Sequence, residues 1–273
     1  LLAVSAGEKT IRIYDAPFGD RPKAELAKTL TGHAAQIFGL CFSDTNTLVS
    51  ISLDQTVKIW DVPSGKMLHN AELPLGKQVR FALGPRHQSL AVDSSFGKAR
   101  LWNYQTGQVL KTFEPNDSWV SALAFTPDGK WLVIGTDKGV VRLMDVAKWT
   151  VTRTIDLDSP VHSLAASAEL ILVGYGDGTV AILNLGEQTS VPEVRKQSAA
   201  INSVAFSPNG SQFASASADR TVKVWNTKTL KLLCSLEGHT APVLSVAFSP
   251  NGKKLASIDA DGNVNFWTAP KSQ

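Results

Sequence analysis

Histidine, serine and aspartate side chains occur in this sequence at spacings that could support nucleophilic catalysis. His33 is followed by Ser50, Ser52 and Asp54. These residue types make up a hydrolase triad, in which histidine accepts the proton of the serine hydroxyl. A catalytic triad is expected to occur once in a chain, whereas the same residue types recur at similar spacings after His239. The recurrence favours a structural role, so we predict that the chain has no catalytic residue and is not an enzyme.

The other side chains with reactive chemistry do not form a recognisable site. His69, His87 and His162 stand singly, without the spacing of zinc ligands, and no glycine-rich phosphate loop follows a strand and opens a helix. Cys41 and Cys234 lie within apolar strand patterns, which predicts buried free thiols rather than a disulfide or a reactive site. We therefore expect no metal and no cofactor, and the two thiols suit a reducing compartment.

Composition favours a folded domain with a solvated surface. Of the 273 residues 43% are hydrophobic, enough for a sizeable core, and the net charge of +3 comes from lysines and arginines spread along the chain. The basic clusters, such as Lys253-Lys254, have no interleaved aromatic residue for base stacking. No stretch has the length of a membrane span, and no signal-peptide pattern opens the sequence. We expect neither a nucleic-acid nor a membrane partner, and an intracellular, cytoplasmic location.

An internal repeat organises the whole chain. Each copy contains two apolar alternating runs, a turn with Asp or Gly, and a short strand that ends in an aromatic or large apolar residue. Successive end positions are 46, 42, 42, 39, 42 and 42 residues apart, which is the period of four-stranded propeller blades. The seven end positions are Tyr14, Trp60, Trp102, Met144, Leu183, Trp225 and Trp267. The alternating runs predict strands without a helix, so the predicted fold class is all-β.

The repeat resembles that of the WD-repeat (Trp-Asp repeat) β-propeller family. Its signature dipeptides are Gly32-His33 and Gly238-His239 at the start of a repeat and Trp60-Asp61 at the end. The resemblance covers essentially the whole chain and implies a seven-bladed propeller of four-stranded antiparallel blades, forming one domain over residues 1–273. It also implies a hydrogen-bonded network within a blade, made by histidine, a hydroxyl, the turn aspartate and tryptophan. The matching residues are His33, Ser52, Asp54, Trp60, Asp219, Trp225, His239, Asp261 and Trp267, with Ser50 as the alternative hydroxyl in the second repeat and Ser257 as the hydroxyl in the last.

The middle repeats depart from the family pattern. The histidine position holds Pro74, Asn116, Leu157 and Gln197 in the third to sixth repeats. The turn-aspartate position holds Phe96 in the third repeat and Lys138 in the fourth. We therefore expect these blades to be held together by packing rather than by the polar network.

The first and last repeats are incomplete. With the strands of a repeat named a to d, the first repeat lacks strand a and the last repeat lacks strand d. In the family's repeat order, one contiguous segment of roughly 25 residues before Leu1 would supply both strands. We therefore expect the chain to be a fragment of a longer protein. The alternative is an intact chain with two irregular blades.

The family resemblance also implies where a partner would bind. In WD-repeat relatives the favoured surface is the face lined by the d–a and b–c connections. Large apolar residues at such rims are the usual anchors of protein interfaces, although Trp119 could instead pack on a neighbouring blade. The candidate partner-binding residues on this face are Gln36, Phe38, Leu53, Trp119, His162, Asn202 and Leu244.

These inferences favour a protein-interaction scaffold that docks a protein or peptide within a larger assembly. One alternative is a ligand-sensing module of a multidomain signalling protein. Another is a propeller hydrolase, which would need carboxylates and histidines clustered at the mouth of the channel. The sequence has no such cluster in register.

Overall fold

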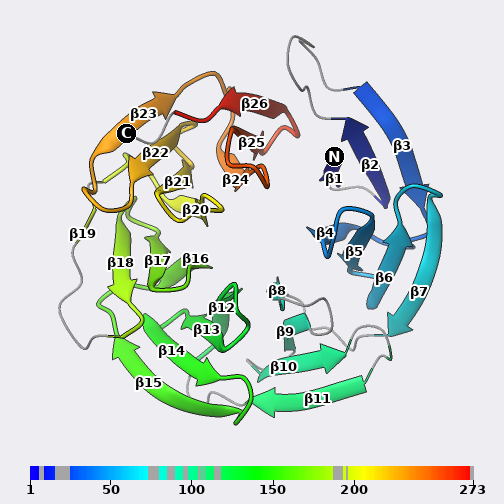
Figure 1. Ribbon diagram of the computed structural model, residues 1–273, viewed down its shortest axis with the longest axis horizontal. Coiled ribbons are helices and arrows are strands. Elements are labelled where there is room, and N and C mark those ends of the chain that lie inside the picture. Colours follow the sequence, from blue (N-terminus) through cyan, green and yellow to red (C-terminus); the bar gives the residue numbers. More distant parts are fainter. Residues whose placement is uncertain are drawn as a thin grey trace. The chain divides into compact units, whose positions relative to one another are not determined.

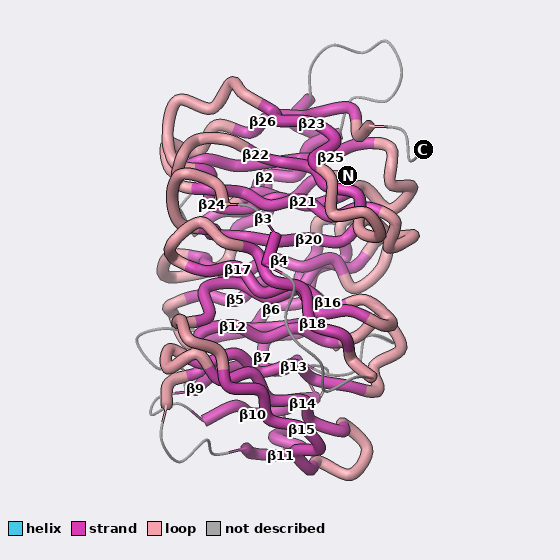
Figure 2. Tube along the Cα trace, turned by 90° about the vertical axis from the view of Figure 1, so that its left-hand side faces the viewer, coloured by secondary structure: helices cyan, strands magenta, loops and turns pink. Residues whose placement is uncertain are grey.

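The computed structural model describes residues 1–5, 9–15, 25–72, 80–84, 90–94, 98–103, 106, 108–113, 118–186, 193–194 and 196–270. Every regular element in these ranges is a β-strand, and Figure 2 shows strands joined by loops and turns. The all-β class predicted from the repeat is confirmed. Within the same ranges, no helix has the length and hydropathy needed to cross a membrane.

The chain divides into two compact units, Leu1–Pro115 and Asn116–Gln273. In the described residues of the first unit, the strands form three antiparallel sheets with the orders β1-β2-β3, β4-β5-β6-β7 and β11-β10-β9-β8 (Figure 1). The strands are β1 (Leu2–Val4), β2 (Thr10–Asp15), β3 (Glu25–Thr31), β4 (Ile37–Phe42), β5 (Thr47–Ser52), β6 (Thr56–Asp61), β7 (Lys66–Glu72), β8 (Phe81–Leu83), β9 (Leu90–Ser94), β10 (Lys98–Asn103) and β11 (Gln108–Phe113).

The described residues of the second unit form four antiparallel sheets, with the orders β12-β13-β14-β15, β16-β17-β18-β19, β20-β21-β22-β23 and β24-β25-β26. The strands are β12 (Val120–Phe125), β13 (Trp131–Thr136), β14 (Val140–Asp145), β15 (Thr150–Asp156), β16 (Val161–Ala166), β17 (Leu170–Tyr175), β18 (Val180–Asn184), β19 (Glu193–Val194), β20 (Ile201–Phe206), β21 (Gln212–Ser217), β22 (Val222–Asn226), β23 (Leu232–Leu236), β24 (Val243–Phe248), β25 (Lys254–Asp259) and β26 (Val264–Thr268).

The sheets correspond to the blades predicted from the repeat. Among the described residues there are seven sheets, of which the first and the last have three strands and the others four. The first sheet has the strands equivalent to b, c and d, and the last has those equivalent to a, b and c, as predicted. The blade count and strand composition are therefore confirmed. That residues 1–273 form one domain stays a prediction.

Burial changes systematically across a sheet. In the sheet β12–β15, strand b (β13) has Leu132, Val133 and Ile134 fully buried, whereas strand d (β15) is mostly exposed. A strand covered on both faces is apolar at consecutive positions instead of alternating, which is why strand b has a continuous apolar run. Each fully buried aliphatic side chain contributes about 1.5–3 kcal/mol, so strand b carries much of the core.

Glycines in strand b let neighbouring sheets of the second unit approach closely. A Cβ atom at Gly135 would lie 2.6 Å from Val161 Cγ1, and one at Gly174 would lie 2.6 Å from Ile201 Cγ2. Val161 and Ile201 begin β16 and β20, the first strands of the next sheets. Along this unit the first strands β12, β16, β20 and β24 contact one another in chain order.

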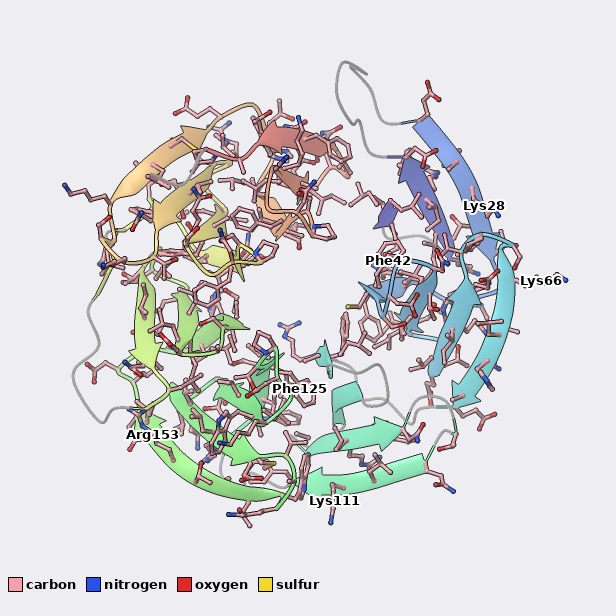
Figure 3. The ribbon with its side chains drawn as sticks, viewed as in Figure 1. Lys28, Phe42, Lys66, Lys111, Phe125 and Arg153 are labelled. Atoms are coloured by element: carbon pink, nitrogen blue, oxygen red, sulfur yellow. The ribbon has the colours of Figure 1, made fainter. Side chains whose placement is uncertain are left out.

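Basic side chains on strand d reach across to the next sheet. Lys28 on β3 donates from Nζ to the carbonyl of Pro63 in the following sheet, and Arg153 on β15 donates from Nη1 to Asn184 O at 2.7 Å (Figure 3). A Cβ atom at Gly65 would lie 3.0 Å from Lys28 Cδ, so the stem of this lysine packs on the same turn. Within each unit, these long side chains couple the exposed strand d to its neighbouring sheet.

Candidate functional site

One end of each sheet carries the connection from strand d to the next strand a and the connection from strand b to strand c. We call this end the d–a/b–c edge. Backbone hydrogen bonds join the two connections in the second sheet, where Leu53 N donates to Gln36 O at 2.9 Å. Asp137 N donates in the same way to Trp119 O at 3.0 Å. Further copies of this bond join Ala218 N to Ala200 O and Ala260 N to Pro242 O.

Strand a has a β-bulge next to this edge in five of the sheets. Ile37 pairs with Ser52, but the next pair joins Gly39 to Ile51, so Phe38 has no residue of strand b directly opposite. A bulge leaves the extra residue out of the ladder and re-aims its side chain, and such bulges are common beside functional sites. The bulged residues are Phe38, Ser121, His162, Asn202 and Leu244. Four of them belong to the set proposed from the sequence to bind a partner.

The predicted partner-binding residues differ in exposure. Leu53, Trp119 and Leu244 are 47%, 56% and 49% exposed, which is unusual for such large apolar side chains. Gln36 and His162 are also exposed. Phe38 is half-buried against the core cluster around Val49. Asn202 is also half-buried, and its Nδ2 donates to Val243 O at 2.8 Å. The last two side chains therefore have structural contacts in addition to their place at the edge. Gln36, Phe38 and Leu53 belong to the first unit, and the others belong to the second.

Trp119 combines an exposed side chain with a fixed backbone. Its N–H donates to Asp137 Oδ1 at 2.8 Å, and its carbonyl accepts the bond from Asp137 N at 3.0 Å. More than half of the side chain is exposed, so a large part of the indole surface is open to contact. A rigid, exposed aromatic residue loses little conformational entropy when it is covered by a partner.

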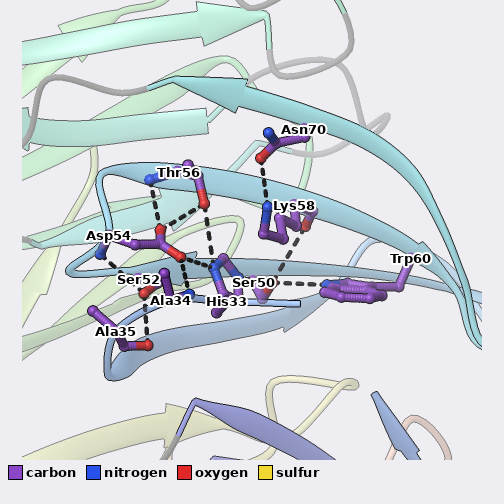
Figure 4. Close-up of polar contacts among 10 residues, drawn as sticks. All are labelled: His33, Ala34, Ala35, Ser50, Ser52, Asp54, Thr56, Lys58, Trp60 and Asn70. Carbon is purple, nitrogen blue, oxygen red and sulfur yellow. Dashed lines mark hydrogen bonds and ion pairs between the residues drawn. The ribbon is translucent and has the colours of Figure 1, made fainter. Parts of the chain in front are cut away.

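The network predicted around His33 is present in the second sheet (Figure 4). Trp60 Nε1 donates to Ser50 Oγ at 2.8 Å, and Ser50 Oγ lies 2.7 Å from His33 Nε2. His33 Nδ1 lies 2.8 Å from Asp54 Oδ2. Indole is only a donor and carboxylate only an acceptor, so in a neutral His33 the hydrogen is on Nδ1, facing Asp54, and Nε2 accepts from the Ser50 hydroxyl. The chain of bonds therefore runs from Trp60 through Ser50 and His33 to Asp54.

Ser52 lies outside this chain of bonds. Its Oγ donates to Ala35 O at 2.9 Å and accepts from Asp54 N at 3.1 Å, so it braces the turn. The serine of the network is Ser50, ten residues before Trp60. Side chains alternate along a strand, but Ser50 and Ser52 share one face and alternation does not separate them. A constant distance of ten residues to the tryptophan would have identified Ser50, since Ser215 and Ser257 have the same distance to Trp225 and Trp267.

The electrostatics of this network keep His33 neutral and Asp54 ionised. Burial lowers the pKa of His33 below its ordinary 6.5, although Asp54 raises it in part. Burial alone would raise the pKa of Asp54, but hydrogen bonds from Thr56, Ala34 and His33 outweigh that effect and lower the pKa to about 2. A neutral imidazole between a hydroxyl donor and a carboxylate agrees with the assigned hydrogens.

The last sheet has a second network with a different acid. Trp267 Nε1 donates to Ser257 Oγ at 2.8 Å, and Ser257 Oγ lies 2.7 Å from His239 Nε2, as predicted. His239 Nδ1, however, lies 2.8 Å from Asp259 Oδ2 and not from Asp261. Asp261, at the register of the other turn aspartates, is exposed and contributes only its backbone N–H, which donates to Asp259 Oδ1 at 3.1 Å. Burial would raise the pKa of Asp259, but bonds from His239 and Asn263 outweigh that effect and lower it.

A third network replaces histidine by glutamine. In the sheet β20–β23, Trp225 Nε1 donates to Ser215 Oγ at 3.0 Å, and Ser215 Oγ donates to Gln197 Oε1 at 2.5 Å. Gln197 Nε2 donates to Thr221 Oγ1 at 3.0 Å, and Thr221 Oγ1 donates to Asp219 Oδ1 at 2.6 Å. The expectation that the sixth repeat relies on packing rather than on the polar network is therefore wrong, whereas Asp219 and Trp225 belong to a network as predicted. An amide supplies one acceptor and one donor, which is what the neutral imidazole of His33 supplies.

In the fourth and fifth repeats the tryptophan position holds Met144 and Leu183, and Leu157 takes the histidine position of the fifth, so these apolar side chains offer no N–H or O–H donor for such a network. Pro74, Asn116 and Phe96 lie outside the described residues.

The residues with triad-like geometry in the second sheet are buried in a hydrogen-bonded network. Ser50 is fully buried, and its oxygen accepts the Trp60 N–H that would have to leave before it could act as a nucleophile. The cysteines are free, and burial raises the pKa of both thiols, that of Cys41 to about 11. Both are half-buried rather than fully buried. No group of three or more His, Cys, Asp or Glu side chains in the described part is arranged to hold a metal ion.

The lowered pKa of His33 predicts a pH-dependent stability. The unfolded chain binds a proton at this histidine near pH 6.5 and the folded chain only at lower pH, so stability is full above about pH 6.5 and declines below it. His33→Gln copies the arrangement of Gln197 and removes the titration. Melting temperatures at about pH 7.5 and 5.5 should fall less for His33→Gln than for the natural chain. Equal falls would contradict the assigned neutral state.

The repeat of this chain matches that of a known protein family. Four segments, residues 24–61, 107–145, 189–226 and 230–268, match the family model described as WD domain, G-beta repeat, and together they make up more than half of the chain. The chain is 24% identical to the guanine nucleotide-binding protein subunit beta of Saccharomyces cerevisiae over 245 residues, which are 87% of this chain and 57% of that protein.

Two further relatives extend this comparison. WD repeat-containing protein SL1-17 of Schistosoma mansoni is 33% identical over 151 residues, 53% of this chain and 49% of that protein. Eukaryotic translation initiation factor 3 subunit I of Emericella nidulans is 26% identical over 224 residues, 75% of this chain and 66% of that protein. The chain thus spans between 49% and 66% of the length of these three relatives.

Proposed function

Because the chain belongs to the WD domain, G-beta repeat family, we propose that it is a scaffold that docks a protein or peptide partner on its d–a/b–c edge within a larger assembly. Two of the relatives are named as subunits, of a guanine nucleotide-binding protein and of translation initiation factor 3. A subunit works in contact with other chains, which supports a scaffold role here.

Trp119 is the observation that carries this proposal. It is 56% exposed on a rigid backbone, and its indole offers a large apolar surface that water covers in the free chain. Tryptophans of this kind dominate the binding energy of protein interfaces. Leu244, 49% exposed at the bulge of β24, offers a second anchor in the same unit.

The proposal includes no catalytic step and no cofactor. The histidine, serine and aspartate side chains that could do chemistry are buried in hydrogen-bonded networks whose members need one another. We also propose the cytoplasm as the place of action, which the free thiols of Cys41 and Cys234 support.

Affinity capture with the chain as bait tests the proposal. Trp119→Ala should reduce recovery of the partner by about thirtyfold, which corresponds to a loss of about 2 kcal/mol at a central anchor. Leu244→Ala should also weaken capture. Leu232→Ala is the matched control, because Leu232 is 46% exposed but lies on β23, a strand d, away from the edge.

Circular dichroism of each variant separates loss of binding from loss of folding. Since Trp119 and Leu244 are exposed, both variants should keep the spectrum of the natural chain. Capture that is unchanged by Trp119→Ala and Leu244→Ala, or reduced as much by Leu232→Ala, would contradict the proposed edge.

A further inference from the structure

The charges of the second unit are unevenly distributed between the two ends of its sheets. The described connections at the d–a/b–c edge contain six carboxylates and three cations. The described turns at the opposite end contain two carboxylates and five lysines. The edge has Asp137, Asp158, Asp177, Asp219, Glu237 and Asp261 with Lys138, Lys196 and Arg220, and the opposite end has Asp128 and Glu169 with Lys130, Lys148, Lys228, Lys231 and Lys253. The edge is therefore acidic although the whole chain has a net charge of +3.

Internal contacts neutralise only part of this charge. Asp177 forms an ion pair with Lys196 at 3.2 Å, although both side chains are largely exposed. Asp219 accepts hydrogen bonds from Ser198 and Thr221 and forms no ion pair within the described residues. The carboxylates of Asp158, Glu237 and Asp261 are exposed and form no ion pair within the described part of the chain. The field at this edge is therefore negative, and a partner with positive charge would be attracted to it.

The exposed apolar anchors lie at the same edge as these carboxylates. Asp137 holds the backbone of Trp119 through Oδ1 and is itself exposed. Leu244 lies in β24, which follows the connection with Glu237, and the bond between Ala260 N and Pro242 O brings the turn of Asp261 to the same edge. An indole face attracts cations, and the attraction is greater when a carboxylate is nearby. An edge that has both exposed apolar side chains and unpaired carboxylates is complementary to a segment that is both apolar and basic.

We infer that the partner segment docked on the d–a/b–c edge of the second unit is basic, with lysine or arginine side chains between apolar residues that cover Trp119 and Leu244. This inference rests on the proposed docking function and adds the chemical class of the partner. An acidic segment would be repelled by the unpaired carboxylates at this edge, and so would a phosphate backbone.

A peptide array tests the inference with the whole chain as the probe. Synthetic peptides of about twelve residues keep one leucine and one phenylalanine fixed and vary in net charge from about −4 to +4, with lysine, glutamate, serine and alanine at the other positions. Retention of the chain should rise at least tenfold from the most acidic to the most basic peptides. It should fall as salt is raised from about 0.05 M to 0.3 M, because screening weakens exposed charges.

Charge-neutral variants locate the effect. The double variant Glu237→Gln with Asp261→Asn should reduce binding of the basic peptides by about three- to tenfold, because both carboxylates are exposed and have no ion pair in the described residues. Glu169→Gln is the matched control, since it removes one exposed carboxylate at the opposite end. Trp119→Ala should weaken binding of basic and neutral peptides alike.

The outcomes separate the inference from the proposed function. Retention that depends on Trp119 but not on peptide charge, or that favours acidic peptides, overturns the inference and leaves the docking function standing. Equal losses for Glu169→Gln and for the double variant also overturn the inference, because the attraction would then come from the whole molecule. Binding of no peptide, or binding indifferent to Trp119→Ala, overturns both.

Discussion

Asp259→Ala is expected to lower the free energy of unfolding by about 2–4 kcal/mol, because a buried donor that loses its acceptor costs about 1–3 kcal/mol. The Asp259 carboxylate is almost completely buried and accepts hydrogen bonds from His239 Nδ1, from the backbone N–H groups of Asp261 and Asn263, and from Asn263 Nδ2. Alanine would leave these donors without their acceptor inside the sheet. Urea denaturation followed by tryptophan fluorescence would measure the change, because Trp267 belongs to the same network.

Asp261→Ala is the matched control for this variant. Asp261 is two residues further along the same turn, and its carboxylate is exposed. Its removal should change stability by less than about 0.5 kcal/mol. If Asp261→Ala destabilises the chain as much as Asp259→Ala, the acid of this network is the one that sequence register indicated, and the geometry described above is wrong.

Gly178→Ala should lower stability by about 2–5 kcal/mol, from a steric clash together with an unfavourable backbone conformation. Gly178 has a φ of +90° in the turn after β17, and a Cβ atom there would lie 2.1 Å from the carbonyl oxygen of Gln197. That carbonyl cannot move away freely, because the N–H of Gln197 donates to Gly178 O at 2.9 Å. Thermal unfolding monitored by circular dichroism would detect the loss.

Gly210→Ala separates the steric clash from the unfavourable backbone conformation. Gly210 has a φ of +69°, but a Cβ atom at that position meets no atom within 4 Å. Only the cost of the left-handed backbone remains, about 1–2 kcal/mol. A Gly210→Ala variant as unstable as Gly178→Ala would refute the close contact between the turn of Gly178 and Gln197.

The architecture could be predicted because it depends on periodic features. The regular spacing of residues such as Trp60, Trp102 and Trp225 determined the blade count, and alternating apolar runs determined the strands. Even the absence of strand a from the first sheet and of strand d from the last followed from counting runs. These properties belong to whole segments, so single departures such as Leu183 did not disturb them.

The members of the networks could be predicted only in part. The position of a residue in the repeat is known from the sequence, but which side chain contacts the histidine is not. Asp261 has the right register, but Asp259 replaces the serine found at Ser52 and Ser217 and brings a carboxylate two residues closer to the histidine. The change from histidine to Gln197 predicts a loss of the network, but an amide provides the same donor and acceptor. Gln197 performs the function of the histidine that it replaces, whereas Asp259 stands at the serine position and performs the function of the turn aspartate.

The bulges could not be predicted from the alternating pattern. A bulge adds one residue to one strand, and the pattern of strand a is compatible with either register at its first positions. Four of the bulged residues, Phe38, His162, Asn202 and Leu244, could nevertheless be predicted to lie at the edge, because they flank the first residue of strand a. The half-burial of Phe38 and the bond from Asn202 to Val243 depend on the neighbouring strands and follow only from the structure.

Hydrogen–deuterium exchange of the chain, alone and with its captured partner bound, tests the docking edge most directly. We expect slower exchange on binding in residues 118–121, 158–162 and 242–244, which form the d–a/b–c edge of the second unit. Exchange in the turns at the opposite end, residues 127–130 and 250–253, should be unchanged. Protection confined to those turns or to the exposed strands β15 and β23, with the edge unprotected, would contradict the account.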